Sequence, residues 1–219
     1  MEDVLKNYLP LIPIFEKPPI EFSAKEAKMY FDWYLGNLDQ RCAYLREIVV
    51  QTSEVTMDAL DFTLESLRPL WAWFLEHAQV VCNDNTQLLK QVLGEGSLKP
   101  EFAKDILKTN DCILSTRTEY LVRDIGMYVG KTFVTQYPQK LSWTYKRKPK
   151  NYIHVNEPLL IGFVQTNDMK GNALSKPYFP DFEPIHMVGV QAVRVLDNRQ
   201  TIDDLYRICR LWSRWIPST

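Results

Sequence analysis

The sequence lacks the short patterns by which many metal and nucleotide sites are recognised. No two of its four cysteines (Cys42, Cys82, Cys112, Cys209) form a C-x-x-C pair, so the spacing of a zinc or dithiol redox site is missing. Its eight glycines form neither G-x-G-x-x-G nor G-x-x-x-x-G-K, which excludes the phosphate-binding loops that those motifs describe. We therefore expect no cofactor, and four reduced cysteines that pack as small apolar side chains.

Long apolar runs are also missing. No apolar stretch approaches the ~18 residues that a membrane-spanning helix needs. Glu2, Asp3, Pro10 and Pro13 occupy the region where a signal peptide would carry basic residues and then an apolar run. We expect a cytoplasmic protein with no membrane partner.

Histidine is scarce, and His77, His154 and His186 lie far apart in the chain. No H-E-x-x-H pattern or triad-like arrangement is present. The sequence thus predicts no catalytic residue and no metal ligand, although residues distant in sequence can still meet in the fold.

The composition is that of a globular protein: 46% of the 219 residues are hydrophobic and 24% are charged. Residues 1–110 carry 11 Lys and Arg against 17 Asp and Glu, a net charge of −6, and residues 111–219 carry 15 against 10, a net charge of +5. The two halves are electrostatically complementary, which favours packing in one body. A balance of +5 is modest support for nucleic-acid binding, so we do not expect nucleic acid as a partner.

Helical signals dominate the first half. Ser23 and Glu26 form a capping box, followed by apolar residues at steps of three and four, which predicts a helix over 24–51. The same period predicts further helices near 57–64, over 67–81 with Pro69 in the first turn, and over 86–93, 100–109, 111–134 and 201–215.

The pattern changes after the 111–134 helix. Alternating, β-branched and aromatic residues predict three strands of an antiparallel meander over 141–146, 151–155 and 158–164. Residues 165–184 have no period and read as a long loop, and residues 185–196 fit either a strand or a helix.

These elements predict an α+β fold. A Pro-rich extended arm (1–22) packs on the body, a helical subdomain (23–110) follows, and a region at 111–219 packs a long helix on a small antiparallel sheet closed by a C-terminal helix. We expect the last two to form one compact body.

Charged residues interrupt the apolar face of the 111–134 helix, at Arg117, Glu119, Arg123 and Asp124. If this helix is buried on several sides, the charges need partners, because an unpaired buried charge is costly. They form either an internal ion-pair network that fixes the helix against the sheet, which is the favoured interpretation, or a polar cleft that recognises a ligand or partner. Trp143 is a further candidate binding residue.

Two other features have structural interpretations that we favour. Gly126 and Gly130 are four residues apart, which lets another element approach the helix closely. The basic run 146–150 could bind phosphate, but between two strands it is more typical of a solvated hairpin tip.

Two segments resemble known bacterial domains. The segment 66–74 contains S-L-x-x-L-W-x-W, and 120–133 has a Gly-Met-Tyr-Val-Gly core followed by Trp143. Both are similar to elements of uncharacterised bacterial domain families, some of which are immunity-like proteins associated with polymorphic toxins. The resemblance implies a packing pattern and no functional residue.

Because no catalytic motif is present, the sequence favours a non-enzymatic protein-binding protein. One form that fits is a bacterial immunity or inhibitor protein that blocks a toxin or effector. Tyr178 and Phe179, on the 165–184 loop, are its expected aromatic anchors. The alternative is an enzyme or small-molecule binder with a polar site between the 111–134 helix and the sheet, using Glu119, Arg123, Asp124 and His154. The oligomeric state is not predicted.

Overall fold

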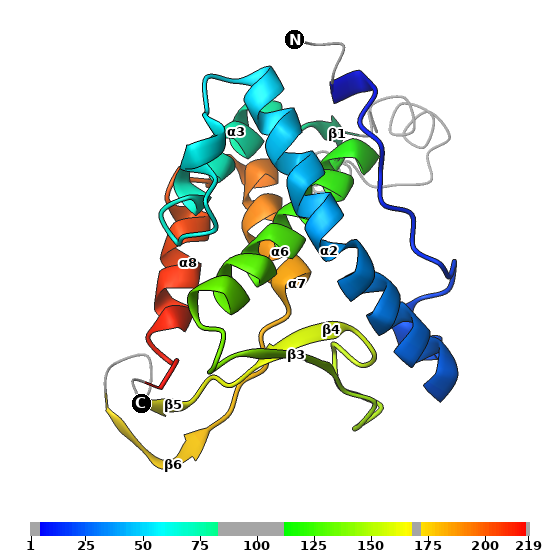
Figure 1. Ribbon diagram of the computed structural model, residues 1–219, viewed down its shortest axis with the longest axis vertical. Helices are drawn as coiled ribbons and strands as arrows, with labels where there is room; N and C mark the ends of the chain where they lie inside the picture. Colours follow the sequence, from blue (N-terminus) through cyan, green and yellow to red (C-terminus); the bar gives the residue numbers. More distant parts are fainter. Residues whose placement is uncertain (1–4, 83–111, 168–171, 218–219) are drawn as a thin grey trace, which may run out of the picture.

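The computed structural model describes residues 5–82, 112–167 and 172–217, and it has an α+β fold. The α-helices pack in one group; two of the three small antiparallel sheets lie below this group in Figure 1, and the third, which includes residues 80–82, lies beside its upper end. The helices are α2 (Ala24–Thr52), α3 (Leu67–His77), α6 (Thr116–Gln136), α7 (Pro184–Ala192) and α8 (Asp204–Ser213), with short 3-10 helices η1 (Pro19–Glu21), η2 (Met57–Ala59) and η3 (Val193–Asp197).

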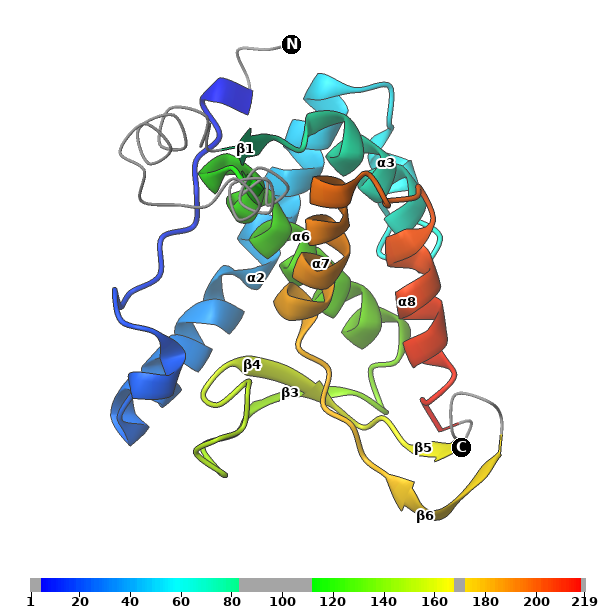
Figure 2. The ribbon, with the colours of Figure 1, turned by 180° about the vertical axis from the view of Figure 1, so that it is seen from behind.

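Each sheet has two strands. β1 (Val80–Cys82) pairs with β2 (Cys112–Leu114), β3 (Ser142–Tyr145) with β4 (Pro158–Ile161), and β5 (Gln165–Asn167) with β6 (Ala173–Tyr178). The β3–β4 pair lies beneath the helices, and β5–β6 extends away from them as a hairpin (Figures 1 and 2).

Helix α6 is the centre of the packing and contacts α2, α3 and α7. Figure 2 shows α7 alongside α6, on the side away from α2. Two glycines permit this approach, as the sequence predicts: a Cβ on Gly126 would lie 2.6 Å from Cα of Ile185, and one on Gly130 would lie 2.3 Å from the Trp143 ring. The glycines therefore fix the N-terminal end of α7 and strand β3 against α6.

A single cluster of buried apolar side chains extends from Leu5 to Ile216 and includes residues of both halves of the chain. Trp71, Trp73 and Phe74 of α3 are almost fully buried within it. The division into 1–22, 23–110 and 111–219 stays a prediction.

The helix starts follow local capping chemistry. Ser23 and Glu26 form the predicted capping box at α2, with Ser23 N donating to Glu26 over 2.8 Å. At the last helix, Asp204 accepts from the backbone and hydroxyl of Thr201, each at 2.7 Å. Pro69 lies in the first turn of α3, which ends at His77 rather than near residue 81.

The strand predictions need correction. Segment 151–155 is not a strand but a series of turns, with only an isolated bridge between Val155 and Lys146. Segment 165–184 is not one irregular loop, because it contains β5 and β6. Segment 185–196 is helical, since Pro184 occupies the first turn of α7 and η3 follows. The helices predicted over 86–93 and 100–109 lie outside the described residues.

The cysteine prediction is wrong for two of the four residues. Cys82 and Cys112 stand opposite each other in the β1–β2 pair, with Cα atoms 4.0 Å apart, and form a disulfide. Cys42 and Cys209 are free and buried, as predicted. Spacing could not reveal the disulfide, because antiparallel pairing of β1 with β2 is what brings the two residues together.

The arm packs on the body less completely than predicted. Leu5 and Tyr8 are buried, whereas Leu9 and Ile12 are exposed. Among the described residues, no helix combines the length and the apolar character that crossing a bilayer requires.

Candidate functional site

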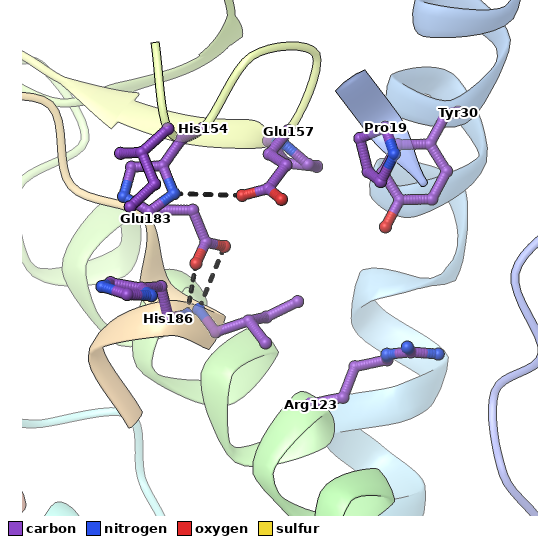
Figure 3. Close-up of a pocket in the computed structure, with 10 residues that line it drawn as sticks. Pro19, Tyr30, Arg123, His154, Glu157, Glu183 and His186 are labelled. Carbon is purple, nitrogen blue, oxygen red and sulfur yellow. Dashed lines mark hydrogen bonds and ion pairs between the residues drawn. The ribbon is translucent and has the colours of Figure 1, made fainter. Parts of the chain in front are cut away.

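A cavity of about 350 Å³ lies where the arm, three helices and the β3–β4 connection meet (Figure 3). We call it the His154 pocket. It is lined by Pro19 of η1, Tyr30 of α2, Arg123 of α6, Ile153, His154 and Glu157 of the connection, Pro158 of β4, the α7 N-cap Glu183, and Ile185 and His186 of α7.

Local backbone chemistry places the pocket's polar residues. Asn156 adopts a left-handed conformation with φ of 63°, which asparagine tolerates better than most residues. Its side-chain amide donates to the carbonyl of Pro19 over 2.8 Å, and its backbone N–H donates to that of Lys146 over 2.7 Å. These bonds tie the connection to both η1 and the end of β3, and so position His154 and Glu157 on either side of Asn156.

Glu183 is the N-cap of α7. Its carboxylate accepts from the backbone N–H of Ile185 at 3.1 Å and from that of His186. The residue is only 4% exposed. Burial, and then the charge of Glu157, raises the pKa of Glu183 to about 8. The end of the helix fixes the carboxylate in place. The backbone hydrogen bonds of His186 and Ile185 and the charge of His154 lower the pKa of Glu183, but they do not offset its burial.

The two histidines of the pocket differ in environment. His154 Nδ1 lies 3.2 Å from Glu157 Oε2, and this hydrogen bond raises the pKa of His154. Burial lowers the pKa of His186. Their rings meet edge to face with centroids 4.7 Å apart. Figure 3 shows the His186 ring turned away from the two carboxylates, whereas His154 faces them.

Three possible ligand atoms converge in this pocket. One donor atom each from His154, Glu157 and Glu183 all lie within 4.8 Å of one another. An imidazole nitrogen with two carboxylate oxygens is a set that can coordinate a metal ion or accept hydrogen bonds from another cation.

The structure brings together only part of the predicted polar site. Arg123 and His154 both line the His154 pocket, and Arg123 Nη1 donates to the carbonyl of Leu11 over 2.9 Å. Glu119 is exposed on α6 and does not line the pocket.

Asp124 belongs to a separate buried cluster with Arg41 and Tyr8. Arg41 Nε donates to Asp124 over 3.2 Å, a second guanidinium nitrogen forms an ion pair with the same carboxylate, and the Tyr8 hydroxyl donates to it. Burial raises the pKa of Asp124 and Arg41 opposes this rise, while burial and the Asp124 charge raise the pKa of Tyr8. The favoured reading of an internal network is therefore right for Asp124, but its partners come from α2 and the arm.

The remaining candidates lie elsewhere. Arg117 lines a different cavity, with Glu76 and His77. Trp143 is half-buried and packs edge to face on Tyr34, with ring centroids 5.4 Å apart, so it is a packing residue.

The other two candidates are exposed. Tyr178 at the end of β6 is 60% exposed and Phe179 is 67% exposed.

The basic run 146–150 is exposed, as a solvated tip should be. Lys146 pairs with Asp181 at 2.6 Å. Arg147 and Lys150 line another cavity, of about 440 Å³, beside η1.

Sequence reasoning missed Glu157 and Glu183 and undervalued His186. Glu183 directly before Pro184 is a helix-start signal that could have placed a carboxylate at the beginning of α7. His154 and Glu157, three residues apart, were a weaker signal, because their pairing depends on turns rather than on a helix.

Comparisons with protein-family models, with curated proteins and with solved structures give no significant match.

Proposed function

We propose that the protein binds a small cation in the His154 pocket. The observation that carries this proposal is the convergence of donor atoms from His154, Glu157 and Glu183 within 4.8 Å of one another. Two carboxyl groups held this close repel each other when both are ionised, and a shared cation removes that repulsion. This function corresponds to the small-molecule binder that the sequence left as an alternative.

The surroundings of the carboxylates also support a bound cation. Arg123 supplies the positive charge that lines the pocket, but it extends toward the arm, where it donates to Leu11. In Figure 3 it lies across the pocket from Glu157 and Glu183. The space between leaves the two carboxylates accessible to a ligand.

The test is calorimetric titration of the full chain with two classes of cation: methylammonium and putrescine, and the chlorides of Mg²⁺, Ca²⁺, Mn²⁺ and Zn²⁺. We expect one class to bind at one site per chain. Binding should be lost in Glu157→Gln and kept in Glu119→Gln, which removes the same charge from an exposed position on α6. If no probe binds, or if both variants bind equally, the proposal is wrong.

The exposed aromatic pair supports a second candidate function, protein binding through the β5–β6 hairpin. Tyr178 and Phe179 are adjacent, largely exposed, and on a hairpin that extends from the body (Figure 1). Aromatic anchors dominate many interfaces, so this exposed pair supports a docking role for the hairpin.

A bacterial immunity or inhibitor protein would use this hairpin against its toxin or effector. The test is titration of this chain with the purified product of the adjacent gene. We expect Tyr178→Ala/Phe179→Ala to abolish binding and Glu119→Gln to leave it unchanged; unchanged binding by the double variant would exclude the hairpin.

The cytoplasmic location stays a prediction. The Cys82–Cys112 disulfide weighs against it, because oxidising compartments are where structural disulfides persist. The ratio of free thiols to disulfide in protein taken directly from its cells would decide between the two.

A further inference from the structure

We propose that the cation bound in the His154 pocket is a divalent transition metal ion of the Zn²⁺ type, with His154, Glu157 and Glu183 as its protein ligands. This inference rests on the proposed function and names its ligand. It assigns a metal site that the sequence pattern does not contain, because the three ligands come from a turn and from the start of a distant helix.

The spacing of the donors is close to what such an ion requires. Ligand atoms about 2.0–2.2 Å from a tetrahedral zinc ion lie about 3.4 Å from one another. The donor atoms of the three residues lie within 4.8 Å of one another. Side-chain rotations that move the donor atoms by about 1 Å would therefore bring them to the spacing that an ion requires, with no change in the backbone.

The chemical types of the donors select among metals. Mg²⁺ and Ca²⁺ bind through oxygen, and Mg²⁺ gives up its water reluctantly. An imidazole nitrogen beside two carboxylates suits Zn²⁺ and its first-row neighbours better. Because His154 faces the carboxylates in Figure 3, its nitrogen is placed to discriminate between the two groups of ions.

The ligands are held in place by contacts outside the site. Backbone N–H groups of Ile185 and His186 fix the Glu183 carboxylate. The close approach of Ile185 to Gly126 fixes that end of α7 on α6. The ring of Tyr152 packs on His154, and its hydroxyl donates to Asp181 over 2.9 Å. Such supporting contacts orient metal ligands and strengthen binding.

His186 lies next to the site but outside the ligand set. Its ring contacts that of His154, yet it turns away from Glu157 and Glu183 (Figure 3). Three protein ligands then leave a coordination position facing the pocket, which is open to water or to a small ligand. His186 is therefore a matched control for His154, because both histidines occupy the same pocket and only one is a ligand.

The experiment titrates metal-free full-length protein with ZnCl₂ by calorimetry, and with CoCl₂ by the visible absorption of four-coordinate cobalt. We expect one ion per chain. His154→Ala and Glu183→Gln should each weaken zinc binding at least about tenfold. Glu119→Gln should change it by less than about threefold, and His186→Ala should weaken it less than His154→Ala does, since neither Glu119 nor His186 contributes a ligand.

A measurement on the unaltered protein guards against variants that fail to fold. Zinc should shift the NMR signals of the His154 ring and leave those of His77 unchanged, because His77 lines a different cavity. Equal shifts of all three histidines, or no shift at His154, would overturn the assignment.

The outcomes separate this inference from the proposed function. If putrescine or methylammonium binds in a Glu157-dependent way and zinc does not, the metal assignment fails and cation binding stands. The same holds if Mg²⁺ binds as tightly as Zn²⁺. If none of the cations binds, both fail. Equal losses in His154→Ala and His186→Ala would also overturn the assignment of ligands.

Discussion

Two ionic clusters lie beside the same long helix, α6, and they are built on opposite principles. Asp124 is enclosed with Arg41 and the Tyr8 hydroxyl, so one carboxylate meets one guanidinium and one hydroxyl donor. One residue earlier, Arg123 faces the His154 pocket, where Glu157 and Glu183 converge with a histidine beside a cavity.

The difference teaches how to separate a structural charge cluster from a site that receives a ligand. The Asp124 cluster is balanced in charge and nearly excluded from solvent, so it has nothing to gain from another ion. The His154 pocket contains two carboxylates and an open volume, so a bound cation would offset the repulsion between them. The following variants test this contrast, from the largest expected effect to the smallest.

Asp124→Asn should have the largest effect on folding. It leaves the Arg41 guanidinium buried without its counter-charge, which costs about 3–5 kcal/mol in the free energy of unfolding. Urea denaturation measures the loss. Glu119→Gln, on the exposed side of the same helix, is the control and should change stability by less than about 0.5 kcal/mol. If Asp124→Asn lowers the free energy of unfolding no more than the control does, the Asp124 cluster is not a stabilising ion pair and the contrast with the His154 pocket is lost.

Glu183→Gln should stabilise the metal-free protein in alkaline solution. The pKa of Glu183 is about 8 in the folded protein and 4.5 ordinarily. Between these values the unfolded chain has lost the proton and the folded chain keeps it, so stability falls as the pH rises toward 8.

The variant removes this decline, because glutamine does not titrate, and its carbonyl oxygen can keep one of the two backbone hydrogen bonds that the carboxylate accepts at the start of α7. At pH 9 we expect it to be more stable than the unaltered protein by on the order of 2–3 kcal/mol. Thermal unfolding between pH 5 and pH 9 in the presence of a chelator measures this. Parallel curves for the two proteins would contradict it.

Tyr8→Phe should have a smaller effect than Asp124→Asn in the same cluster. The ring still packs, but Asp124 loses a hydrogen bond to a charged group, worth about 1.5–3 kcal/mol at most, and retains Arg41. We expect a loss near the lower end of that range. Tyr178→Phe is the control, since Tyr178 is exposed; an equal loss there would show that the Tyr8 hydroxyl has no special role.

Glu157→Gln should have the smallest effect on stability and a large effect on binding. Its pair with His154 is partly exposed to solvent, so the metal-free variant should lose less than about 1 kcal/mol. Zinc affinity should nevertheless fall at least about tenfold. Denaturation and calorimetry on the same preparation compare the two effects. A large stability loss without a change in affinity would make the pocket a structural cluster like that of Asp124.

Much of the fold could be predicted, because its signals are local. The capping box at Ser23, the apolar period along α6 and Pro69 in the first turn of α3 each depend on residues a few positions apart. The spacing of Gly126 and Gly130 also predicted that another element approaches α6 closely, but the sequence did not identify α7 and β3 as the approaching elements.

The candidate site could not be predicted because its parts come from separate segments. The described residues between Glu157 and Glu183 form the three strands β4, β5 and β6, and no period links the two carboxylates. The partner of Asp124 could not be named from the sequence for the same reason, because Arg41 lies 83 positions earlier in the chain.

The pairing of β1 with β2 has a consequence for how the chain could change over evolution. Cys82 and Cys112 stand opposite each other with Cα atoms 4.0 Å apart, so positions 82 and 112 are neighbours in space and are joined covalently. A change in the length of the chain between these two positions leaves this spacing fixed, because the disulfide holds the two ends together. This junction is therefore a natural place to exchange one segment for another, or to attach a label or a second protein, while the His154 pocket stays as it is.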